Sequence, residues 1–199
     1  MIELGTATEA EMVSAFLQAE IDSAGRFAPS LNNALAYYGA PASIVRNPDL
    51  ASQAENLIRS GVLGLYRGYP DKLLFTGFPP DVTWTRVRID SADFARLYCA
   101  DDHDKLTRLS VPDRLILSAA RNYSAGHPAA ADFPHIGAIV ADLRTGKCFA
   151  PLIPVEYPNS WLVLIEGHSR AIARAIAKMT DDVDLLLGRA MSFDTWYFR

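Results

Sequence analysis

The sequence predicts an α+β protein in which helices pack on a small mixed sheet, and three observations lead to this class. Half of the 199 residues are apolar and 21% are charged, which is typical of a globular protein with a sizeable core. The last third alternates apolar patterns in the order helix, strand, turn, strand, helix, strand. The middle adds two short segments rich in aromatic and β-branched residues, as strands are.

The N-terminal part reads as mostly helical. Thr8 and Glu11 have the spacing of a capping box, and apolar residues then recur at helical spacing, so we expect a helix over roughly 9–20. The other elements expected before residue 105 are a loop over 23–33, a helix from Asn47-Pro48 to about Gly61, strands over 73–78 and 82–89, and a short helix from Ser91.

The expected strand 82–89 has an unusual pattern. Its apolar positions switch parity between Trp84 and Val87. A β-bulge would cause such a switch, and so would a strand that is buried on different faces at its two ends.

The C-terminal part has the clearest periodicity. We expect helices over 112–123, 134–143 and 168–179, an extended segment over 150–157, and strands over 161–165 and 183–187. Gly146 is placed to follow the end of the second of these helices.

No repeat or linker divides the chain, so we expect residues 1–199 to form a single compact body. Within it, 1–105 would be a mostly helical N-terminal extension with a strand pair, and 110–199 would be the more orderly unit. The two cysteines form no disulfide framework or paired metal motif, and no signal segment or membrane-length apolar run is apparent, so the expected compartment is the cytoplasm.

The junction between the strand 161–165 and the helix that follows it concentrates polar chemistry. Glu166 ends the apolar run, and Gly167, His168, Ser169 and Arg170 follow at once. A first helical turn has free N–H groups and a positive dipole, and a glycine lets an anion approach closely. Phosphate would then be bound by all four residues from Gly167 to Arg170, and Glu166 or His168 would be the acid–base candidate.

The four residues of this turn could also have purely structural roles. Gly167 could serve only a tight turn, His168 or Ser169 could only cap the helix, and Arg170 could belong to a solvated face with later basic residues. Arg170 counts slightly against a structural role, because a cation in the first turn opposes the helix dipole. A bound anion would reverse that cost, so Arg170 is expected to matter for binding and little for stability.

The motifs around this junction resemble those of the ParB/sulfiredoxin-like superfamily over roughly residues 110–199. The resemblance is carried by Gly146, the strand start Pro151-Leu152-Ile153, the Gly-x-x-Arg turn 167–170 and the small-residue helix 171–177. It implies that the turn contacts nucleotide phosphates, so the expected ligand is a nucleoside di- or triphosphate with Mg²⁺ or another phosphorylated small molecule.

The chain also departs from both named types of that superfamily. About twenty residues follow Met179, too few for the DNA-reading helix-turn-helix of ParB proteins. The turn has no cysteine, which sulfiredoxins require there. The resemblance therefore implies neither chromosome segregation nor sulfinic acid repair.

The leading hypothesis is a nucleotide- or phosphate-binding protein, with phosphoryl transfer or nucleotide hydrolysis as the reaction if it is an enzyme. Arg114 and Arg121 are seven apart on the expected helix 112–123 and could complete the phosphate site. We expect no metal site in the protein alone and no membrane partner. A nuclease or other nucleic-acid-processing enzyme is an alternative, although the net charge of −4 does not favour nucleic acid. The other alternative is a non-catalytic interaction module.

Overall fold

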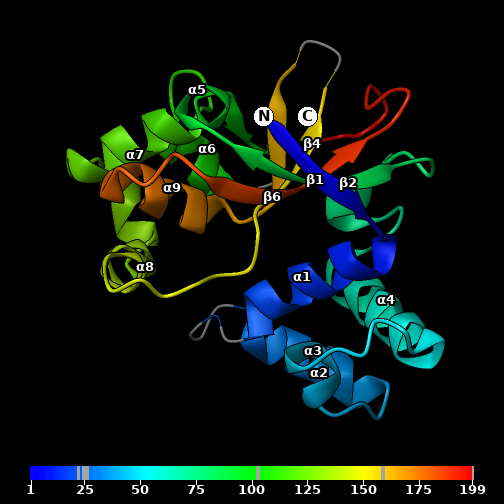
Figure 1. Ribbon diagram of the computed structural model, residues 1–199. Helices are drawn as coiled ribbons and strands as arrows, with labels where there is room; N and C mark the ends of the chain where they lie inside the picture. Colours follow the sequence, from blue (N-terminus) through cyan, green and yellow to red (C-terminus); the bar gives the residue numbers. More distant parts are fainter. Residues whose placement is uncertain (22, 24–26, 102–103, 158–159, 199) are drawn as a thin grey trace.

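The computed structural model describes residues 1–21, 23, 27–101, 104–157 and 160–198 and confirms the α+β class (Figure 1). The strands are β1 (Ile2–Ala7), β2 (Thr83–Ile89), β3 (Leu97–Cys99), β4 (Ile153–Glu156), β5 (Leu162–Glu166) and β6 (Val183–Arg189). The helices are α1 (Glu9–Ile21), α2 (Ala28–Tyr37), α3 (Ser43–Arg46), α4 (Gln53–Arg67), α5 (Ser91–Phe94), α6 (Asp104–Leu109), α7 (Ile116–Ser124), α8 (His135–Arg144) and α9 (His168–Ala177), with the 3₁₀ helices η1 (Leu73–Phe75) and η2 (Pro128–Asp132).

The strands of the described residues form one mixed sheet in the order β1-β2-β6-β4-β5-β3. Neighbouring strands are antiparallel except for β6 with β4 and β5 with β3, which are parallel. Strands from the first 105 residues occupy both edges of the sheet, and β2 pairs directly with β6. The sheet is therefore built from both parts of the chain.

Two groups of helices cover the two faces of this sheet (Figure 1). On β5, Val163 and Ile165 pack in the core that contains α1 to α4, whereas Leu162 and Leu164 pack in the core of α5 to α9. Both faces are buried, so β5 reads as a continuous apolar run instead of an alternating one.

The sequence places α1 correctly, and the expected capping box is present. The Thr8 N–H donates to Glu11 Oε2 at 2.7 Å, and the Glu11 N–H donates to Thr8 Oγ1 at 3.2 Å. Met12 and Phe16 follow as fully buried residues of the apolar face. The first turn and the buried face thus fix the helix by independent means.

The structure corrects the expected loop over 23–33 and the expected helix from Asn47-Pro48 to about Gly61. Residues 28–33, expected in a loop, belong to α2, and Asn47 ends α3 instead of starting a helix. The following helix, α4, begins at Gln53, where the Ser52 hydroxyl caps it. It continues past Gly61 because its left-handed end residue is Gly68, at φ 82°.

The first strand of the expected pair, over residues 73–78, does not form. Residues 73–75 form η1, and β2 pairs with β1 and β6 instead. The parity switch in β2 is explained by burial on different faces, because Trp84 packs in one core and Val87 in the other. The bulge lies in the partner strand β1, where the register shifts before Gly5.

The order of elements expected after residue 134 is confirmed as α8, β4, β5, α9 and β6. The helix expected over 112–123 begins later, at Ile116 in α7, and β3 replaces the end of the expected helix after Ser91. Among the described residues, no helix is both long and apolar enough to cross a membrane.

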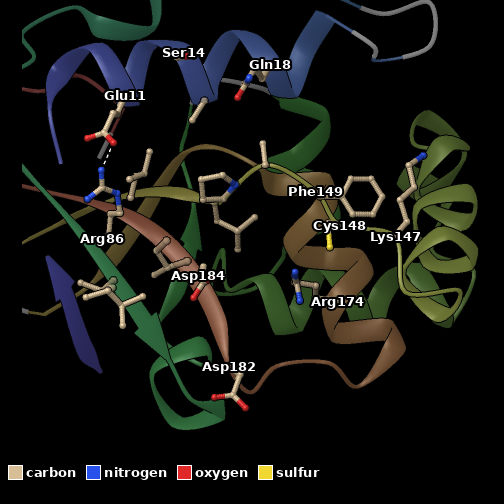
Figure 2. A pocket seen from close by; sticks show the side chains of 18 of the residues that line it. Glu11, Ser14, Gln18, Arg86, Lys147, Cys148, Phe149, Arg174, Asp182 and Asp184 are labelled. Atoms are coloured by element: carbon tan, nitrogen blue, oxygen red, sulfur yellow. Dashed lines mark hydrogen bonds and ion pairs between the residues drawn. The ribbon is translucent and has the colours of Figure 1, made fainter. Parts of the chain in front are cut away.

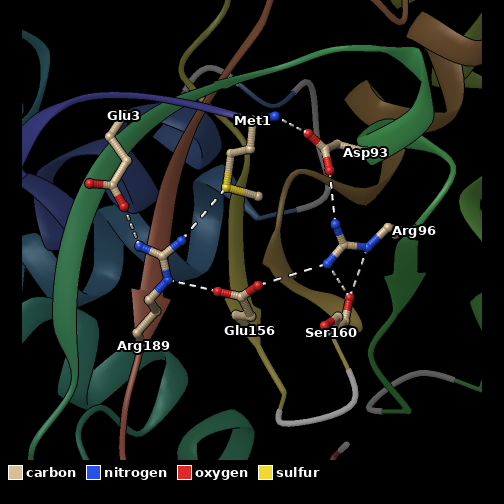
Figure 3. A network of polar contacts seen from close by, with 7 residues as sticks. All are labelled: Met1, Glu3, Asp93, Arg96, Glu156, Ser160 and Arg189. Carbon is tan, nitrogen blue, oxygen red and sulfur yellow. Dashed lines mark hydrogen bonds and ion pairs between the residues drawn. The ribbon is translucent and has the colours of Figure 1, made fainter.

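Ion pairs link the strands at one end of the sheet (Figure 3). Arg189 of β6 donates to Glu156 of β4 at 2.7 Å and to Glu3 of β1 at 2.8 Å. Arg96 extends the network from Glu156 to Asp93. Because β4 and β5 are antiparallel, with Glu156 opposite Leu162, this network lies at the other end of β5 from Glu166.

Candidate functional site

The turn between β5 and α9 begins with a glycine that the backbone requires. Gly167 has φ 102°, and a Cβ on it would lie 2.6 Å from Leu152 Cδ2 and 3.2 Å from an Arg170 guanidinium nitrogen. The helix starts at His168, and no side chain of the preceding residue caps it. The first-turn N–H groups that a helix cannot bond internally are thus left without that usual partner.

All four residues of this turn line a pocket of about 540 Å³. The opposite wall comes from the end of α1, including Gln18 and Glu20, and from Arg67 at the end of α4. The start of α8 and the segment 147–150 complete it. The helices of the N-terminal part therefore close a site whose floor is the predicted turn.

Arg170 has a different environment from the one expected. It is only 7% exposed, and its guanidinium donates to Glu166 Oε1 at 2.9 Å and to the Pro151 carbonyl at 3.3 Å, as well as to the Ala150 carbonyl. These acceptors offset the unfavourable helix dipole. Arg170 thus holds the segment before β4 against the turn, and the expectation that it matters little for stability must be revised.

Two histidines make hydrogen bonds at the turn, His135 from α8 and His168 of the turn itself. Ser169 Oγ lies 2.9 Å from Nε2 of His135, the first residue of α8. If Nε2 carries the proton, it donates to Ser169, and the hydroxyl proton is free for a ligand oxygen. His168 Nε2 accepts the Ala100 N–H at 3.3 Å, which ties the turn to the end of β3. His135 was not among the sequence-predicted site residues.

The structure adds a buried carboxylate that sequence reasoning missed. Glu20 is 2% exposed, and its Oε1 is ion-paired with Arg67. Burial and the negative charge of Glu166 raise the pKa of Glu20 to about 7, against the opposing effect of Arg67. One sequence feature could have indicated it, because Glu20 lies four residues after Phe16 on the apolar face of α1.

Aromatic residues surround the Glu20–Arg67 pair. The Arg67 guanidinium lies 4.3 Å from the Phe27 ring centroid and 4.7 Å from that of Tyr66. Glu20 Oε2 and the Tyr66 hydroxyl are buried, and neither makes a hydrogen bond within the described residues. Burial and the Glu20 charge also raise the pKa of Tyr66.

Every lysine and arginine that lines this pocket has a carboxylate partner. The three pairs are Arg67 with Glu20, Arg170 with Glu166, and Lys147 with Asp142. The pocket is therefore close to neutral. An anion would depend on N–H and hydroxyl donors more than on an unpaired cation.

Arg114 and Arg121 do not join the site. Arg114 precedes α7 and has φ 62°, so the two residues do not share a helical face as expected. Neither lines the pocket; Arg114 lies 3.8 Å from an Asp101 carboxylate oxygen, and Arg121 is exposed. In the part of the chain that the structure describes, no group of three or more His, Cys, Asp or Glu residues is arranged to hold a metal ion.

Comparisons with protein-family models, curated proteins and solved structures give no match to this chain. The resemblance to the ParB/sulfiredoxin-like superfamily consequently rests on the motifs in the sequence alone.

Proposed function

We propose that this protein binds a nucleotide, or another phosphorylated small molecule, in the pocket at the start of α9. The observation that carries the proposal is the uncapped first turn of α9, which begins at the left-handed Gly167 and lines a pocket of about 540 Å³. Helix N-termini of this kind bind phosphate through backbone N–H groups. The volume lies within the range of small-molecule sites.

The phosphate would lie against the backbone of Gly167 to Arg170. Gly167 starts the turn in a left-handed conformation that favours glycine, and the Ser169 hydroxyl adds a donor whose orientation depends on His135. Arg170 would act by holding the turn and residues 150–151 in position. This differs from the direct phosphate contact that the sequence led us to expect of it.

The other lining residues suit the remainder of a nucleotide. Phe27, Phe133 and Phe149 line the same pocket and offer apolar surface to a base. Glu166 also lines this pocket and is the carboxylate that would help to hold Mg²⁺ together with phosphate oxygens, because Mg²⁺ is commonly bound by one or two carboxylates plus substrate phosphates. The ion would neutralise phosphate charge when bound.

For catalysis, phosphoryl transfer or nucleotide hydrolysis is the reaction class that we propose. Glu20 is the favoured proton acceptor, since its pKa of about 7 lies near neutral pH. Glu166 and His168 are the acid–base candidates from the sequence. Glu166 accepts a hydrogen bond from Arg170, and His168 accepts one from the Ala100 N–H. Such chemistry depends mainly on positioning and charge, and the cytoplasm is the compartment that we propose for it.

A thermal-shift panel tests the binding proposal. ATP, CTP, GTP, UTP, ADP and inorganic phosphate would each be added with and without Mg²⁺. A ligand present at about 100 times its Kd should add about 2.7 kcal/mol of stability, or roughly 5–10 °C in Tm. The proposal fails if none of these ligands raises Tm. A rise with single-stranded DNA or RNA alone would support the nucleic-acid alternative instead.

A further inference from the structure

A second pocket, of about 600 Å³, adjoins the first. The two pockets share Gln18 of α1 and the segment 147–150. Figure 2 shows Arg174 entering the second pocket from α9, with Cys148 beside it and Gln18 across from it on α1. Most of the remaining wall is apolar, with leucines from β6 and from the segments before α4 and β4.

Arg174 differs from the other basic residues of this pocket. Arg86 is paired with Glu11, and Lys147 is paired with Asp142. Within the described residues, the Arg174 side chain makes no hydrogen bond or ion pair, although it is about half buried. Burial and the positive charge of Arg170 lower the pKa of Arg174. A partly desolvated cation without a directly bonded acidic partner is unfavourable, and an anion bound to it would relieve this cost.

The acidic groups of the pocket limit the charge of that anion. Asp184 attracts Arg174, but both of its carboxylate oxygens accept from Arg88, at 2.7 Å and 3.2 Å. Asp182 also lines the pocket. A multiply charged phosphate would be repelled by these two carboxylates, whereas a single carboxylate matches one guanidinium in charge and in bidentate geometry.

From these observations we infer that the second pocket binds a small organic carboxylic acid, with Arg174 holding its carboxylate and the apolar wall holding its hydrocarbon part. The site is distinct from the proposed nucleotide pocket and does not rest on it. If both are filled, the two ligands lie next to each other across the segment 147–150.

Cys148 provides a direct reporter, because it is exposed while Cys99 is buried. The Cys148 thiolate displaces iodide both from iodoacetate, which carries a carboxylate, and from neutral iodoacetamide. A change in the reactivity of the thiolate itself affects both rates equally. It therefore cancels when the rate with iodoacetate is divided by the rate with iodoacetamide. Binding of the carboxylate at Arg174 should make this ratio about fivefold or more higher in the wild type than in Arg174→Gln. Arg144→Gln, which removes an exposed arginine outside both pockets, is the matched control and should keep the wild-type ratio.

A second measurement uses the wild-type protein alone, so that it does not depend on the folding of a variant. Butyrate should slow alkylation of Cys148 by iodoacetate, whereas chloride at equal ionic strength should not. Equal rate ratios in the wild type and a folded Arg174→Gln variant would overturn the inference, and so would equal effects of butyrate and chloride. Neither readout requires a nucleotide, so failure of this site is separable from failure of the first one.

Discussion

The Arg170 guanidinium donates to Glu166 Oε1 at 2.9 Å, which closes an ion pair across the Gly167 turn. Both side chains are largely buried, with 9% and 15% of their surfaces exposed. The same guanidinium reaches the carbonyls of residues 150 and 151. One side chain therefore joins the end of β5, the start of α9 and the segment that separates the two pockets.

This arrangement predicts that Arg170→Ala destabilises the protein by about 2–4 kcal/mol, because Glu166 and the carbonyls of residues 150 and 151 lose their donor. Urea unfolding of the wild type and the variant measures this difference. Combining Arg170→Ala with Glu166→Gln should cost less than Arg170→Ala alone, since no unpaired charge remains buried. An unfolding free energy within about 0.5 kcal/mol of the wild type would instead indicate a solvated Arg170.

The raised pKa of Glu20 predicts that the stability of the protein depends on pH. Its pKa is raised from 4.5 to about 7 in the folded protein, so the native state binds this proton more tightly than the unfolded state does. The resulting stabilisation is complete below about pH 4.5 and is lost as the pH rises through about 7. The stability of the wild type relative to Glu20→Gln should accordingly decline across this range.

Urea unfolding at a series of pH values measures that decline. Glu166→Gln provides a further comparison, because the Glu166 charge contributes to raising the Glu20 pKa. In that variant the decline should move to lower pH. A constant difference between the wild type and Glu20→Gln from pH 4.5 to 8 would contradict the raised pKa.

Ser169→Ala is expected to weaken binding of the best nucleotide from the thermal-shift panel by about tenfold, since the variant lacks a hydroxyl donor to a charged phosphate. The loss of the contact with His135 should lower the free energy of unfolding by only about 1 kcal/mol. Isothermal titration gives the affinities, with Arg144→Gln as the control of unchanged affinity. An unaltered Kd in Ser169→Ala would remove the hydroxyl from the proposed site.

Limited proteolysis should not release a stable fragment of residues 110–199, because we predict a single compact body. In the sheet, β6 pairs with β2 and β5 pairs with β3, so such a fragment would lose both neighbouring strands. It would also expose the apolar face that α1 covers. Mass spectrometry of the digest would identify a resistant C-terminal fragment, whose appearance would contradict this prediction.

The sequence by itself determined those helices and strands that are specified by residues close to one another in the chain. The capping box before α1, the periodicity of α8 and α9, and the apolar run of β5 all lie within a few residues. The α+β class followed from them. The site turn was predictable for the same reason, because a strand pattern changes to a helix pattern at Gly167.

Only the tertiary structure decided which residues surround that turn. The Glu20–Arg67 pair spans 47 positions, the Ser169–His135 contact 34, and the bond from Ala100 to His168 spans 68. The edge strand β1 escaped prediction because most of its residues are exposed and it is ordered by pairing with β2, a strand that lies far from it in the sequence. Such contacts form when apolar faces pack together, and no local spacing in the chain encodes which polar groups then meet.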